Sequence, residues 1–191
     1  MKRPLRFVSA AAALAVAIAA PARAHMTPPV ALASERDAVT RLLSGSSRYF
    51  VREVRLSPAG KDAIRKRTGW SADDDYYRFY VGRGTDGATI ASAVLLTDFT
   101  IHGPVRAAVA LAPDGKVKGV LLVEVTEETY SWVKPLLDSG FLQRFVGSDA
   151  ASAAKSVAGV ENAMARFYAG VIAGLVGRAA ALYEVAISKG P

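Results

Sequence analysis

A β-hairpin signal in the middle of the chain constrains the fold more than any other feature. Two apolar stretches of strand composition, Val105–Leu111 and Val117–Val125, are separated by Pro113-Asp114-Gly115. Pro and Asp favour a tight turn, and Gly supplies the positive φ that such turns need. A connection this short joins neighbouring antiparallel strands, so we expect a largely antiparallel sheet built around this pair.

The segments before the hairpin predict two helices and three more strands. Ser34 is a good N-cap for a first helix, which ends before Ser44 and places Val39, Leu42 and Leu43 on one face. A second helix begins at Ser57-Pro58 and is closed by Gly69. The expected strands are Tyr49–Leu56, Tyr76–Val81 and Ala88–Asp98, and Asp73-Asp74-Asp75 reads as a solvated acidic turn.

After the hairpin the pattern is helical. We expect a short helix over Leu136–Phe145 and one long helix within Ser156–Ser188. Gly170, Gly174 and Gly177 suggest that the long helix packs closely against another element. The predicted fold class is therefore α+β: a largely antiparallel sheet with N-terminal helices and a long C-terminal helix.

Residues 1–24 have the three parts of a secretory signal peptide. A basic start is followed by the apolar stretch Val8–Ala20, and Ala22-Arg23-Ala24 places small residues at the cleavage positions. The alternative is a single membrane anchor, for which the apolar stretch is short and is interrupted by Pro21. Cleavage after Ala24 would leave residues 25–191 as a single domain in the periplasm or otherwise exported.

Composition excludes several functions. The chain has no cysteine, which rules out a disulfide scaffold, a thiolate metal site and a cysteine nucleophile. The formal net charge is +7, but the signal segment holds four basic residues and no acid, so the mature charge is +3. A balance this small argues against nucleic acid as a partner. There is also no glycine-rich phosphate loop and no Gly-x-Ser-x-Gly nucleophile motif.

The order of segments over most of the mature chain resembles the FMN-binding domain family. The stretches that carry the resemblance are Thr97–Val105, Ala107–Glu124 followed by Glu128-Thr129, and Phe141–Gly147 followed by Val157–Val160 and a long helix ending at Glu184; Ala38–Thr68 is similar to the lead segment of exported members. The family includes flavin-carrying subunits of the sodium-pumping NADH:quinone oxidoreductase and of its Rnf relatives. The resemblance implies FMN as cofactor and a role in electron transfer.

The chain departs from the family at the flavin-attachment motif. Flavin-carrying members have Ser-Gly-Ala-Thr, and the threonine hydroxyl is joined to the FMN phosphate. The aligned residues here are Ala158, Gly159, Val160, Glu161, Asn162 and Ala163, with Glu161 at the acceptor position. A carboxylate has no hydroxyl to esterify, and repulsion from a phosphate about 4 Å away costs about 4 kcal/mol at an effective dielectric near 20. Covalent attachment at this position is thus excluded, and noncovalent FMN is disfavoured too unless its phosphate lies elsewhere, so FMN would have to be noncovalent or absent.

The resemblance implies a cofactor site lined by Glu128, Thr129, Ala158, Gly159, Val160, Glu161 and Asn162. Tyr130, Trp132 and Phe141 would lie on the flavin-ring side, where they either stack on the ring or fill the core. Arg166 either pairs with Glu161 or binds a phosphate. Thr89 lies in a stretch that partly copies the acceptor motif, and it is expected to be an ordinary turn leading into a strand.

Two further groups of residues allow other chemistry. Glu124, Glu127 and Glu128 could act as acid and base, although a solvated strand end explains them more simply. His25, as the first mature residue, could chelate Cu(II) with its terminal amine, and His102 could complete that site; the alternative is a free terminus and a turn histidine. No catalytic residue is assigned.

These observations predict an exported FMN-binding-domain-like protein in periplasmic electron transfer, with noncovalent flavin and a membrane redox partner. The alternative is a flavin-free binding or assembly module of the cell envelope. In either case we expect an electron carrier or accessory protein rather than a stand-alone enzyme, and no integral membrane protein once the signal is cleaved.

Overall fold

The computed structural model describes residues 27–188, so the predicted signal peptide (1–24) and His25 lie outside the described residues. All strand pairs are antiparallel and form one sheet of order β1-β6-β5-β4-β3-β2. The elements are β1 (Pro29–Ala31), α1 (Glu35–Leu42), β2 (Arg48–Val54), α2 (Pro58–Thr68), β3 (Tyr77–Arg83), β4 (Thr89–Thr100), β5 (Gly103–Leu111), β6 (Val117–Thr126), α3 (Glu127–Asp138), the 3₁₀ turns η1 (Phe141–Phe145) and η2 (Ala153–Val157), α4 (Ala163–Tyr183) and its π-helical continuation η3 (Glu184–Ser188). The predicted α+β class is confirmed.

The predicted hairpin is formed by β5 and β6. Val109 pairs with Val120, and Gly115 adopts φ 82° in the turn. The Asp114 carboxylate accepts a hydrogen bond from the Lys116 amide at 3.0 Å, and this local contact stabilises the turn. The pair lies in the middle of the sheet, where it supports helices on both faces.

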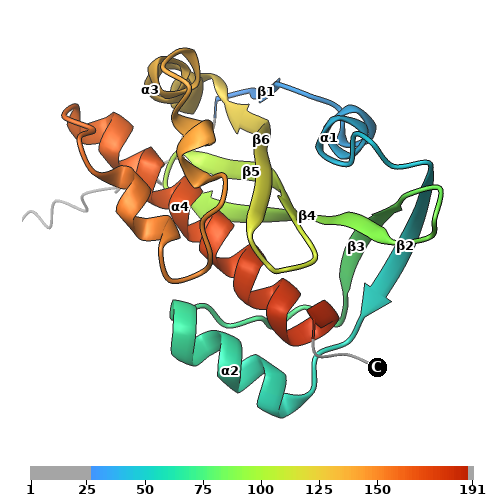
Figure 1. Cartoon of the computed structure of the whole chain (residues 1–191). Coiled ribbons are helices and arrows are strands. Elements are labelled where there is room, and N and C mark those ends of the chain that lie inside the picture. Colours follow the sequence, from blue (N-terminus) through green and yellow to red (C-terminus); the bar gives the residue numbers. More distant parts are fainter. Residues whose placement is uncertain (1–26, 189–191) are drawn as a thin grey trace, which may run out of the picture.

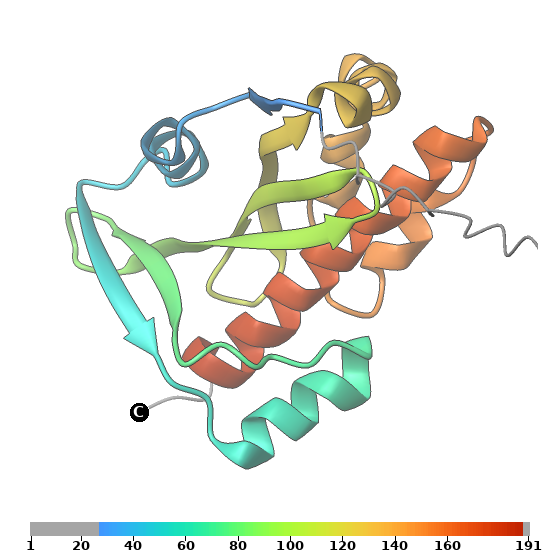
Figure 2. The same cartoon turned by 180° about the vertical axis from the view of Figure 1, so that it is seen from behind.

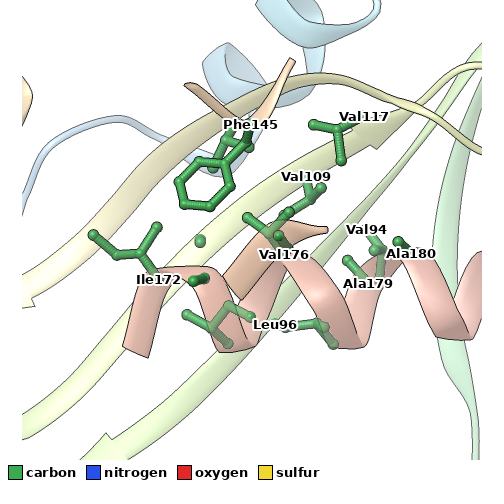
Figure 3. Close-up of a cluster of buried hydrophobic side chains, with 14 of the residues drawn as sticks. Val94, Leu96, Val109, Val117, Phe145, Ile172, Val176, Ala179 and Ala180 are labelled. Carbon is green, nitrogen blue, oxygen red and sulfur yellow. The ribbon is translucent and has the colours of Figure 1, made fainter. Parts of the chain in front are cut away.

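Alternation along β5 divides the core into two layers. Val105, Ala107, Val109 and Leu111 belong to a large cluster with α4, whereas Ala108 and Ala110 belong to a smaller cluster with α1. Since successive side chains of a strand point to opposite faces, one strand contributes to both layers. Figure 3 shows the α4 layer, in which Val109 lies beside Val176 of the helix and Val94 lies beside Ala179 and Ala180.

The helices cover the two faces unequally. The helix α4 crosses one face of the sheet with α2 beside it, and α1 lies on the opposite face (Figures 1 and 2). Between the sheet, α2, α3 and η2, α4 is surrounded by protein along most of its length, which explains why it is apolar nearly all round.

The caps of the two N-terminal helices match the prediction. The Ser34 hydroxyl accepts the Asp37 amide at 3.0 Å, and the Ser57 hydroxyl accepts the Gly60 amide at 3.1 Å. Gly69 ends α2 at φ 69°, a left-handed conformation that glycine adopts without strain.

The predicted helix over Leu136–Phe145 is wrong. The helix α3 begins at Glu127, nine residues earlier, because Thr126 caps it and two acids in its first turn complement the helix dipole. Pro135, which suggests a helix start, lies within α3 instead. Gly140 at φ 69° then separates α3 from η1. Glu127 and Glu128 directly follow the end of β6, as expected, with Glu127 exposed, and they also form the N-terminus of α3.

The close packing expected at the α4 glycines holds only at Gly177. A Cβ on Gly177 would lie 3.5 Å from the Ala150 carbonyl oxygen, whereas a Cβ on Gly170 or Gly174 would meet nothing within 4 Å. These two glycines lie on a groove of about 280 Å³ and not against another element.

Candidate functional site

The predicted residues Glu128 and Thr129 lie in the first turn of α3, against the start of the described chain. The Glu128 amide donates to the Thr27 hydroxyl at 3.1 Å, and the Glu127 amide donates to the Pro28 carbonyl at 2.9 Å. The short strand β1, which follows Pro28, pairs with the end of β6. The segment at residues 27–31 therefore satisfies amides that would otherwise be free at this helix end.

A chain of buried hydroxyls connects α3 to α4. Thr126 Oγ1 lies 2.9 Å from the His102 carbonyl oxygen and 3.0 Å from Thr129 Oγ1, which lies 3.1 Å from the Tyr168 hydroxyl. A carbonyl only accepts, so the proton of Thr126 is directed to His102. Thr129 must then donate to Thr126, and Tyr168 to Thr129. All three hydroxyls have partners, and Thr129 and Tyr168 are fully buried.

Aromatic rings surround this chain of hydroxyls. The Trp132 ring stacks on Tyr168 with centroids 5.7 Å apart and planes 14° apart, and His102 meets the Trp132 ring edge-on at 4.9 Å. His102 Nδ1 lies 3.3 Å from the Glu128 carboxylate. Of the other predicted aromatics, Phe141 is fully buried in the core and Tyr130 packs partly buried against it.

The second predicted segment, residues 158–162, forms the turn before α4. Gly159 has φ 79°, and the Asn162 side chain caps α4 by accepting the Ala165 amide at 3.0 Å. The Arg166 guanidinium donates to the carbonyls of Val160 at 2.6 Å and Glu161 at 3.1 Å, so it binds the backbone of the turn. Glu161 is exposed.

A second arginine reaches the same turn. Arg144 Nη1 donates to the Ala158 carbonyl at 3.0 Å. Two guanidinium groups and the N-terminus of a 21-residue helix therefore lie at residues 158–162, which is an electrostatic setting suited to an anion.

The two predicted segments meet α4 at different places. Thr129 contacts Tyr168, whereas residues 158–162 precede the helix, and Asn162 and Tyr168 are about 9 Å apart along its axis. The positions expected to face a flavin ring are already paired, since Trp132 stacks on Tyr168 and the Thr129 hydroxyl is satisfied. The turn before α4 therefore suits a phosphate better than the region of Thr129 suits a ring, while the Glu161 carboxylate opposes a phosphate beside it and gives no acceptor for a covalent bond.

A cleft elsewhere was not predicted from the sequence. It has a volume of about 590 Å³ and lies where the chain after α2 meets β3, β4 and β5. Its lining is aromatic and charged: Trp70, Tyr76, Tyr77, Tyr80 and Phe99 with Glu35, Asp73, Asp74, Arg78 and Arg106, together with Ser71, Leu95, Leu96 and Thr97. None of the predicted cofactor residues belongs to this lining. The volume is that of a typical small-molecule site.

The arginines of the cleft are already paired. Arg106 donates to Glu35 at 2.6 Å, the Tyr80 hydroxyl donates to the same carboxylate, and Arg78 donates to Glu53 at 3.1 Å. The hydrogen bond from Tyr80 lowers the pKa of Glu35 most, and burial opposes it. The hydrogen bond and positive charge of Arg106 lower it further, so the pKa of Glu35 lies below its usual range.

Tyr77 forms a buried part of the cleft wall. Its side chain is 3% exposed, its ring meets Trp70 edge-on at 5.8 Å, and no hydrogen-bond partner for its hydroxyl is found among residues 27–188. Burial and then the negative charge of Asp74 raise the pKa of Tyr77 to about 12, although the Asp74 backbone amide lowers it somewhat. The hydroxyl is therefore neutral and lacks an acceptor, which is costly for a buried group.

Part of the cleft lining could have been predicted from the sequence. Asp73-Asp74-Asp75 was expected to be a solvated turn, and all three residues are exposed, but two of them also line the cleft. The dense run Trp70–Tyr80 of aromatic and acidic residues could have marked the site. Glu35, Leu95 and Arg106 could not be added, since only the folded sheet brings them to it.

The other predicted sites have simple explanations in the structure. Thr89 is the first residue of β4, as expected for a turn leading into a strand. Within residues 27–188 no group of three His, Cys, Asp or Glu side chains is arranged to hold a metal ion. The copper hypothesis depends on His25, which lies outside the described residues.

No family model, curated protein or solved structure matches this chain. One segment of the described chain, Ala163–Ser188, is long and apolar enough to cross a membrane by length and composition. In the structure 61% of its most apolar window is buried, and the core helix of a soluble protein passes the same test.

Proposed function

We propose that this chain is an exported, flavin-free binding module of the cell envelope that uses the cleft between Trp70 and Arg106. The observation that carries the proposal is the pairing of Trp132 with Tyr168. The family resemblance puts Trp132 on the flavin-ring side, and one face of this ring already stacks on Tyr168. The cleft offers a different binding site, because its volume of about 590 Å³ is large enough for a small ligand.

Export is part of the same proposal. It rests on the signal-like pattern of residues 1–24. Mass analysis of the exported protein should find a chain that begins at His25. Recovery of exported protein that still carries Met1 would contradict cleavage.

A second candidate is periplasmic electron transfer with noncovalent FMN and a membrane redox partner. The observation that favours it is the turn before α4, where Arg144 and Arg166 lie beside a helix N-terminus. Those groups would hold the phosphate, and bound flavin would supply one- and two-electron redox chemistry. In both candidates the protein acts as a carrier or accessory protein.

One experiment distinguishes the two candidates. The precursor is expressed in a host that has a flavin transferase, and the flavin absorbance of the exported protein is recorded before and after acid precipitation. The flavin-free proposal predicts no flavin in either fraction and no binding of added FMN.

Other outcomes overturn the proposal in distinct ways. Flavin released into the supernatant would establish the noncovalent carrier, and Arg166→Gln should then weaken retention while Arg36→Gln, on the other side of the fold, should not. Flavin remaining in the precipitate would mean covalent attachment, and Thr89→Ala would test the remaining threonine motif.

A further inference from the structure

We infer that the ligand of the cleft is a small organic cation, an ammonium group carried on an apolar body. This inference rests on the proposed function, since it names the ligand class of that same cleft.

The first step is the charge balance of the lining. Both arginines are bound to carboxylates, Arg106 to Glu35 and Arg78 to Glu53. Among residues 27–188, no ion pair is found for Asp73 or Asp74. The uncompensated charge of the cleft is therefore negative, and an incoming cation would find two carboxylates without partners.

The second step is the aromatic lining. The electron-rich faces of Trp and Tyr rings attract ammonium and guanidinium groups. The fold already uses this attraction beside the cleft, where the Arg178 guanidinium lies 5.8 Å from the centre of the Trp70 ring. Tyr76 and Phe99 remain 47% and 79% exposed at the cleft, so an apolar ligand body would cover ring surface that water now contacts.

The third step is the hydroxyl of Tyr77. It is a buried donor in the cleft wall without an acceptor in the described chain. Buried polar groups nearly always have a partner, and the Tyr77 hydroxyl oxygen is an acceptor to which an ammonium N–H could donate.

The test compares three probes that share one phenyl body and differ in charge: 2-phenylethylamine, 2-phenylethanol and 3-phenylpropionate. The chain has two tryptophans, Trp70 and Trp132. Trp132→Phe leaves Trp70 as the only one, so its fluorescence reports on the cleft, and calorimetry on the wild-type chain gives a second measurement. We expect the amine to bind at least tenfold more tightly than the alcohol, the carboxylate to bind least, and added salt to weaken the amine alone.

Matched variants locate the site. Asp73→Asn combined with Asp74→Asn should remove the preference for the amine, whereas Asp75→Asn, which changes the adjacent acid outside the lining, should preserve it. Circular dichroism shows whether each variant keeps the fold.

Equal binding of amine and alcohol, tighter binding of the carboxylate, no binding of the amine, or an unchanged preference in the double variant would each overturn the inference. These titrations are made on protein already measured as flavin-free. A chain that carries flavin thus refutes the proposed function, whereas a flavin-free chain that ignores the amine refutes only the ligand class.

Discussion

The buried hydroxyl chain between α3 and α4 gives the sharpest test of the structure. Thr129 is its middle member, donating to Thr126 and accepting from Tyr168. Thr129→Val keeps the volume of the side chain and removes only the hydroxyl, so it creates no cavity. The change removes two hydrogen bonds and leaves the fully buried Tyr168 hydroxyl without its acceptor.

The expected cost follows from these losses. Two neutral hydrogen bonds contribute about 1 kcal/mol each, and an unsatisfied buried hydroxyl adds a further penalty of about 1 kcal/mol, for a total of about 3 kcal/mol. Tyr168→Phe removes one bond and leaves no donor unsatisfied, so it should cost about 1 kcal/mol. The double variant loses the same two bonds without the orphaned hydroxyl, so it should cost about 2 kcal/mol and not the additive sum of about 4 kcal/mol.

Urea unfolding of the wild type and the three variants measures this cycle. Tyr183→Phe is the control on the same helix, since its hydroxyl makes only a 3.5 Å contact with the Pro113 carbonyl, and it should change the unfolding free energy by less than about 0.5 kcal/mol. Additive effects of Thr129→Val and Tyr168→Phe, or a Thr129→Val cost below about 0.5 kcal/mol, would refute the deduced direction of the chain.

Three further changes test other parts of the fold. Tyr77→Phe removes a hydroxyl without a partner and should leave the unfolding free energy unchanged or raise it by about 1 kcal/mol; a clear loss in thermal unfolding would mean that the hydroxyl is bonded. Gly82→Ala would put the new Cβ 2.0 Å from Ser46 Oγ, so it should lower the free energy of unfolding measured in urea by about 1–3 kcal/mol. Gly45→Ala is not a suitable control, because Gly45 has a positive φ. Because the pKa of Glu35 is lowered in the fold, its contribution to stability is complete above its ordinary value of 4.5 and is lost as the pH falls through the folded value. Glu35→Gln should therefore lower the melting temperature at pH 7 and approach the wild type in acid, and a gap that widens on acidification would contradict this.

The prediction of the fold succeeded where local chemistry decides the structure. The turn at Asp114-Gly115, the caps at Ser34 and Ser57 and the left-handed Gly69 depend on a few adjacent residues, and all are present as expected. The start of α3 was missed although Thr126 and the two acids of its first turn mark it.

The site was less predictable. The resemblance directed attention to Thr129 and residues 158–162, and the sequence could show that Glu161 lacks a hydroxyl. It could not show that Thr129 is buried against Tyr168, 39 positions away, or that Arg166 turns back to the Val160 carbonyl. Such contacts depend on how α3 and α4 pack.

The amino-acid sequence by itself determined the α+β class, the central hairpin and the ends of α1 and α2, because period-two alternation, turn residues and caps act over a few positions. Only the tertiary structure decided the cleft. Folding pairs Arg106 with Glu35, 71 positions apart, so that these two charges compensate each other. The net charge of the cleft lining is then set by Asp73 and Asp74 and is negative. Charge compensation requires atoms within about 4 Å, and that distance is fixed by packing and not by position in the chain.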